Sequence, residues 1–189
     1  MILKSFLFWQ PKTDYLKLLK TTKISRTLTV FLNYLIWFFL FFISYLLIKS
    51  KTNLFWLILI ATVVGEFIEK IGKKMCLWKR PMTLRHDTVP PGLVQKWYQT
   101  GSFPSGHTIK ATYFFLFLLQ YSVISPIIFL ATTIPLLFFR VLVGFHYPID
   151  MLGGIIIGIV IWFCVQSLIF PEILLNLTRL VFNFVFLIN

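Results

Sequence analysis

Charged residues are scarce in this sequence, and acidic residues are the scarcest of them. Charged residues make up 13% of the 189 positions, where soluble domains average roughly a quarter. Only 6 residues are Asp or Glu, against 18 that are Lys or Arg. The sequence also has just two cysteines, Cys76 and Cys164. A disulfide-rich secreted scaffold is therefore excluded.

Apolar residues are abundant instead. They account for 58% of the chain, and Phe alone occurs 22 times. A soluble domain of this length has too little interior to bury that much apolar surface, and a disordered chain would contain far less of it. The composition therefore predicts an integral membrane protein with one compact domain.

The net charge of +12 would suggest a nucleic-acid partner in a soluble protein. Here the basic residues cluster between apolar runs, which favours anionic lipid headgroups or a phosphorylated substrate. We therefore expect the lipid bilayer and a membrane lipid phosphate as partners, and no nucleic acid. The N-terminal apolar stretch is too short and too interrupted for a signal peptide.

The apolar runs predict an all-α, polytopic transmembrane bundle with five spans. Residues 1–27 carry six basic side chains and predict an amphipathic segment on the membrane surface. Residues 171–189 fit either a short sixth crossing or a surface helix. The glycines of the fifth span, at 153, 154 and 158, permit close helix packing. The five expected spans are 28–48, 54–72, 107–125, 126–145 and 147–170.

Ionisable residues beside apolar spans are costly, so each calls for an explanation. At the end of the second span, Glu66 and Glu69 lie four residues before Lys70 and Lys73, and we expect two i,i+4 ion pairs. In the polar stretch that follows, Arg85-His86-Asp87 is interpreted as solvated. Farther along it, Trp97 and Tyr98 predict a short helix at the membrane interface.

Three other polar groups fall on one membrane face if the predicted spans are right. The first lies at the exit of span two, the second at the entry of span three, and the third between spans four and five. Any one of these groups alone would be weak evidence for a site. Their occurrence together on one face is much stronger evidence. The groups are Lys73 with Arg80-Pro81; Pro104-Ser105-Gly106-His107; and Arg140, His146 and Asp150.

The residue types in these groups suit phosphate chemistry. Ser105 and Gly106 open a helix, whose free N–H groups and positive dipole end attract anions. The spacing of His146 and Asp150 places both on one helix face, where the carboxylate can fix the imidazole tautomer and leave the other nitrogen free to attack or to take a proton. Arg140 can bind phosphate oxygens in a forked geometry.

The motifs resemble those of the type 2 phosphatidic acid phosphatase (PAP2) superfamily, whose pattern is KxxxxxxRP, PSGH and SRxxxxxHxxxD. About ten specified positions agree across residues 73–150, and one departs, because Phe139 replaces the family's Ser. The resemblance implies that His146 forms a phosphohistidine, that Asp150 orients it, and that His107 protonates the leaving oxygen. It implies a phosphate cradle of Lys73, Arg80, Ser105, Gly106 and Arg140.

By the same resemblance, residues 28–189 form a membrane phosphatase domain that hydrolyses a lipid phosphomonoester or diphosphate. Candidate substrates are undecaprenyl diphosphate, lipid A 1-phosphate, phosphatidylglycerol phosphate and phosphatidate. No metal or other cofactor is expected, since fixed donors can stabilise the charge that spreads in the transition state. The alternatives are a lipid-to-lipid phosphotransferase using the same phosphohistidine and a non-catalytic membrane protein that retains the motifs.

Two arguments disagree about which membrane face carries the site. Residues 1–27 and 70–106 hold six and seven basic residues, whereas the first short loop on the other face holds only Lys49 and Lys51. The positive-inside rule therefore places the site in the cytoplasm. The family resemblance implies an extracytoplasmic site in the bacterial inner (plasma) membrane, and we follow the resemblance.

Overall fold

The computed structural model describes residues 2–11, 23–84 and 100–186, and within these ranges all regular structure is helical. The all-α prediction is confirmed for this part of the chain. The helices are α1 (Ile2–Leu7), α3 (Lys23–Ser50), α4 (Thr52–Met75), α5 (Pro81–Leu84), α6 (Gly106–Tyr121), α7 (Pro126–Leu142), α8 (Pro148–Val165) and α9 (Glu172–Phe186).

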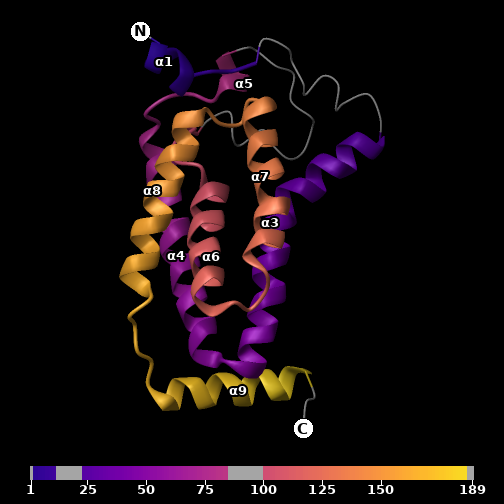
Figure 1. Ribbon diagram of the computed structural model, residues 1–189, viewed down its shortest axis with the longest axis vertical. Coiled ribbons are helices and arrows are strands. Elements are labelled where there is room, and N and C mark those ends of the chain that lie inside the picture. Colours follow the sequence, from indigo (N-terminus) through magenta and orange to yellow (C-terminus); the bar gives the residue numbers. More distant parts are fainter. Residues whose placement is uncertain (1, 12–22, 85–99, 187–189) are drawn as a thin grey trace.

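The five longest helices before the C-terminal segment form an elongated bundle (Figure 1). α4, α6, α7 and α8 run along its long axis, with α3 beside them, while α1 and α5 lie at one end. α9 lies across the opposite end, roughly perpendicular to the bundle. Hydrogen bonds from Trp56 to Thr178 (3.1 Å) and from Arg179 to Thr52 (2.9 Å) hold it there. Residues 172–186 therefore form a helix that packs across the end of the bundle, and the choice between a sixth crossing and a surface helix stays a prediction.

The bundle is apolar on both its inside and its outside. Phe114, Phe117 and Phe129 are fully buried between the helices. On the outer face, Phe41 and Phe163 are 73% and 63% exposed. A soluble protein rarely exposes such wide apolar surfaces, so this surface, like the composition, indicates association with a membrane.

The number of membrane spans differs from the expectation. Among the described residues, one helix, Pro148–Val165, is both long and apolar enough to cross a bilayer by length and composition. Tyr34–Ser50 and Pro126–Leu142 are apolar but shorter. All five expected helices exist, yet α6 is only 16 residues long and contains Lys110, and α4 carries charged side chains throughout its C-terminal half. The expected count of five membrane spans is therefore not confirmed.

Close packing of α6 against α8 sets the geometry near the site. A β-carbon on Gly154 would come within 2.8 Å of Thr108 Cβ, and one on Gly158 within 2.7 Å of Thr112 Cβ. Side chains at these two positions would push the helices apart, so the predicted role in close helix packing is confirmed for Gly154 and Gly158. Gly153 instead faces the ring of Phe103, in the loop before α6. The approach brings the first turn of α8 against the start of α6.

Candidate active site

The three polar groups predicted from the sequence converge at one end of the bundle. α4 and α7 end there, and α6 and α8 begin there (Figure 1). The predicted convergence of the groups is therefore observed, and their place on one membrane face stays a prediction. Three backbone hydrogen bonds join the segments that carry them: Gly101 N to Lys73 O (3.0 Å), Met82 N to Gly144 O (2.9 Å) and Ser105 N to Asp150 O (3.1 Å).

Asp150 caps α8 and also lies beside His146. α8 begins with Pro148, and the Asp150 carboxylate accepts a hydrogen bond from Tyr147 N at 2.7 Å, which satisfies a backbone donor at the helix start. The same carboxylate accepts hydrogen bonds from Trp78 Nε1 at 2.9 Å and from Ser102 Oγ. Three donors, one from the backbone and two from side chains, thus fix a fully buried carboxylate next to an equally buried imidazole.

The His146 imidazole has one nitrogen near this carboxylate and one without a partner. Nδ1 lies 3.5 Å from both Asp150 Oδ2 and Ser102 Oγ. These distances are long for hydrogen bonds, and such contacts commonly tighten when substrate binds. Nε2 is buried and has no hydrogen-bond partner among the residues that the structure describes. It is therefore the nitrogen available for attack.

The electrostatic environment keeps His146 neutral. Burial lowers the pKa of its imidazole well below 6.5, and the positive charges of Arg80, Arg140 and Lys73 lower it further. Its position between α7 and α8 therefore supplies an unprotonated ring at neutral pH. Because the surrounding cations disfavour a positive ring, they also favour a bound anion.

The two arginines of the motifs are buried close to the histidines. Arg80 is 1% exposed and donates from Nη1 to Phe145 O at 3.0 Å, which ties it to the residue before His146. Burial lowers the pKa of the Arg80 guanidinium to about 10, so it stays charged at neutral pH. Arg140, at the end of α7, places Nη1 3.4 Å from His107 Nε2. The second histidine is thus held beside an arginine.

Ser105 and Gly106 form the start of α6, as predicted. Ser105 is fully buried at the N-cap position, and its Oγ lies 2.9 Å from Thr108 Oγ1. Gly106 has no room for a side chain, because a β-carbon there would collide with the carboxylate of Glu69. The helix start is therefore closely approached by an acidic group that belongs to α4.

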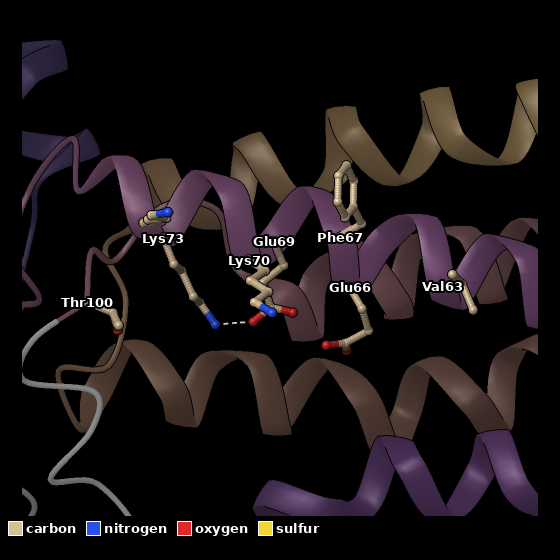
Figure 2. Close-up of a pocket in the computed structure, with 8 residues that line it drawn as sticks. Val63, Glu66, Phe67, Glu69, Lys70, Lys73 and Thr100 are labelled. Carbon is tan, nitrogen blue, oxygen red and sulfur yellow. Dashed lines mark hydrogen bonds and ion pairs between the residues drawn. The ribbon is translucent and has the colours of Figure 1, made fainter.

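Lys73 points away from α4 into a cavity of about 800 Å³, where it forms an ion pair with Glu69 (Figure 2). This i,i+4 pair confirms one of the two ion pairs expected in α4. The other expectation was wrong, because Glu66 pairs with Lys110 of α6 rather than with Lys70. Lys110 is almost completely buried, so its ammonium needs a carboxylate more than the exposed Lys70 does.

A comparison with protein-family models gave one match: the model described as the PAP2 superfamily matches residues 51–173. The match covers well over half of the chain and contains every residue of the three groups. The chain belongs to the PAP2 superfamily. No curated protein and no solved structure matched it.

Membership of the PAP2 superfamily indicates phosphatase activity on phosphate esters, and with the helical fold and its candidate span it indicates membrane association. The position at which this chain departs from the family pattern, Phe139, is half-buried one residue before Arg140. Two other predictions, the solvated Arg85-His86-Asp87 and the interfacial Trp97 and Tyr98, fall outside the described residues.

Sequence reasoning missed three residues that contact the site or its neighbours. Trp78 and Ser102 both donate to Asp150, from loops whose sequence gives no sign of this contact. Lys110 had a visible signal, since it is a lone charge in the apolar run of α6. An ionisable residue in such a run is a candidate functional residue by default.

Proposed function

We propose that this PAP2 protein is a membrane lipid phosphatase that works through a phosphohistidine on His146. The observation that supports this most strongly is the state of His146 itself. Its ring is neutral and buried, Nε2 lacks a partner among the described residues, and Asp150 lies beside Nδ1. A neutral imidazole with one oriented nitrogen and one available nitrogen is what nucleophilic attack on phosphorus requires.

The first half-reaction would form the phosphoenzyme. His146 Nε2 attacks phosphorus, the bond from phosphorus to the leaving oxygen breaks, and His107 gives that oxygen a proton. Asp150 stabilises the positive charge that develops on the His146 ring. In the second half-reaction, His107 takes a proton from water, the hydroxide oxygen bonds to phosphorus, and the bond to His146 breaks to release inorganic phosphate.

Fixed positive charges would stabilise the phosphoryl group during both steps. Arg80 and Arg140 are buried and charged beside His146, which makes their interaction with an anion strong. Lys73, the Ser105 hydroxyl and the Gly106 amide complete the proposed cradle. Because these donors are already oriented, they can meet the transition-state charge without a metal ion.

A second cavity supports a lipid substrate over a water-soluble one. It has a volume of about 580 Å³ and lies between the N-terminal segment, α7 and α8. Its walls are apolar and include Phe6, Trp9, Val141 and Met151. Val141 follows Arg140 and Met151 follows Asp150, so the cavity adjoins helix turns that carry the site. We propose that it holds hydrocarbon of the substrate.

The remaining parts of the proposal concern the membrane. The five helices α3, α4, α6, α7 and α8 would each span the bilayer of a bacterial inner membrane, with the site on the extracytoplasmic face. Labelling of Cys76, which is exposed beside the site, with a membrane-impermeant maleimide in intact cells tests the orientation. The exposed Cys164, at the other end of α8, is the matched control, with each thiol examined in a variant lacking the other.

The function is tested with purified protein in lipid nanodiscs that contain one candidate substrate at a time. The four candidates are undecaprenyl diphosphate, lipid A 1-phosphate, phosphatidylglycerol phosphate and phosphatidate. We expect release of inorganic phosphate from at least one of them by the wild-type protein and none by His146→Ala. Transfer of the phosphoryl group to a second lipid without phosphate release would instead identify a phosphotransferase. Equal phosphate release by the variant would reject the mechanism.

A further inference from the structure

The mechanism leaves Lys110 without a role, although its position is unusual. Its side chain extends from the apolar helix α6 and is only 4% exposed. The ammonium pairs with Glu66 and lies 3.2 Å from Glu69 Oε2, and both carboxylates belong to α4. Burying a lysine costs desolvation free energy even when two carboxylates pair with it. A buried lysine in an apolar helix is therefore a candidate functional residue.

Glu69 connects this lysine to the phosphate site. One of its oxygens pairs with Lys73 and the other faces Lys110. Figure 2 shows Lys73 and Glu69 extending from α4 toward the same cavity, with the ion pair between them. The carboxylate also contacts the start of α6, since it occupies the space that a side chain at Gly106 would fill.

Glu69 is thus an anion bound by groups that the proposed function assigns to substrate phosphate. The start of α6 and the ammonium of Lys73 both favour a negative charge, and here an internal carboxylate supplies it. A phosphate that takes Lys73 must compete with that carboxylate. If Lys73 leaves, the largely buried Glu69 keeps a cationic partner because Lys110 lies on its other side.

We propose that Glu69 holds Lys73 in the substrate-free enzyme and releases it to the substrate phosphate, while Lys110 keeps the charge of Glu69 compensated. Both would be positioning residues, acting on substrate through Lys73. The proposal rests on the proposed function, because it takes Lys73 as a phosphate ligand.

If Lys73 exchanges Glu69 for the substrate phosphate, replacing Glu69 and replacing Lys110 should change phosphate affinity in opposite directions. Glu69→Gln removes the competing charge and frees Lys73, so it should tighten the binding of phosphate and of vanadate. Lys110→Gln leaves Lys73 as the main partner of Glu69, so it should weaken that binding. In the double variant the charge that Lys110 compensates is gone, and binding should resemble that of Glu69→Gln.

The test is the inhibition constant of vanadate for wild type, both single variants and the double variant, in detergent at one pH. We expect the constant to fall roughly tenfold in Glu69→Gln and to rise roughly tenfold in Lys110→Gln, as is usual for coupled charges in contact. The change should appear in KM for substrate more than in kcat. Lys70→Gln is the matched control: Lys70 lines the same cavity but pairs with neither carboxylate, and it should leave the constant unchanged.

If the ion pairs of Glu69 with Lys73 and Lys110 serve only to stabilise the fold, the variants should behave differently. Both single variants would then weaken vanadate binding, lower the unfolding temperature and show no recovery in the double variant, and this result would overturn the proposal. If Lys110→Gln does not fold, Glu69→Gln decides alone, since an unchanged or higher inhibition constant contradicts the exchange. A wild-type protein that releases no phosphate and ignores vanadate would instead reject the proposed function itself.

Discussion

The indole nitrogen of Trp78 donates a hydrogen bond to Asp150 Oδ1 at 2.9 Å, joining the loop after α4 to the first turn of α8. The ring of Trp78 also packs edge-on against Phe8, with centroids 5.2 Å apart, and Phe8 packs on Tyr147 at 5.3 Å. The N-terminal segment therefore contacts the residues that hold Asp150. Through these contacts, the N-terminal segment that lines the apolar cavity also supports Asp150, the neighbour of the proposed nucleophile His146.

Replacing Trp78 with Phe should lower turnover about tenfold with little effect on folding. The ring contacts with Phe8 can persist, but Asp150 loses one donor, and hydrogen bonds to charged groups contribute roughly 1.5–3 kcal/mol. The measurement is kcat in nanodiscs together with the unfolding temperature. Trp56→Phe is the control, because it removes an indole hydrogen bond to Thr178 at the far end of the bundle. Equal losses of kcat in both variants would show that the loss does not depend on the hydrogen bond to Asp150.

The apolar cavity predicts a dependence on substrate chain length. Trp9→Ser removes one of its walls and should raise KM about tenfold for a long-chain lipid phosphate, since less apolar surface is buried on binding. KM for a short-chain, water-soluble analogue should not change. Phe184→Ser serves as the control, because Phe184 is 80% exposed on α9 at the opposite end. If both substrates are affected equally by Trp9→Ser, the cavity does not bind hydrocarbon.

Protonation of His146 should couple folding to pH. Its pKa in the folded protein is well below 6.5 because of burial and the nearby cations, whereas the unfolded chain binds a proton near pH 6.5. Below that pH the unfolded state binds more protons, so stability falls as pH falls, by about 1.4 kcal/mol per pH unit at most. Unfolding temperatures between pH 7.5 and 5 should therefore decline more steeply for wild type than for His146→Gln. Parallel curves would contradict a depressed pKa.

Activity should not require a metal ion. The proposed cradle meets phosphate with two buried arginines and a lysine, which leaves no charge for a metal to supply. Phosphate release should therefore survive EDTA, and vanadate should inhibit as a mimic of five-coordinate phosphorus. A strict requirement for magnesium, restored on its addition, would show that the cradle is incomplete.

The sequence predicted the helices and the convergence of the motifs because both depend on local patterns. Apolar runs define the long helices α3, α4, α6, α7 and α8, and motifs placed at helix ends meet where those ends meet. The same local reasoning correctly paired Glu69 with Lys73. It failed for Glu66, because the partner, Lys110, comes from another helix and is chosen by burial rather than by spacing.

Contacts across long sequence separations were beyond prediction for the same reason. The bond from Trp78 to Asp150 spans 72 positions and depends on how α8 packs against the loop after α4. The tail could not be assigned either, since a short apolar helix suits a crossing and a surface equally well. Its position is decided by side chains, through the hydrogen bond from Arg179 to Thr52. The interfacial role of Trp97 stays a prediction.

The phosphohistidine is the central claim, and trapping it tests the claim most directly. Wild-type protein is mixed for a short time with a lipid substrate labelled on its phosphorus, quenched in alkali, where phosphohistidine is stable, and digested for mass spectrometry. The account predicts a phosphoryl group on His146 that is lost in acid, and no labelled protein from His146→Ala. Turnover by the wild type with label on another residue, or equal labelling of the variant, would contradict it.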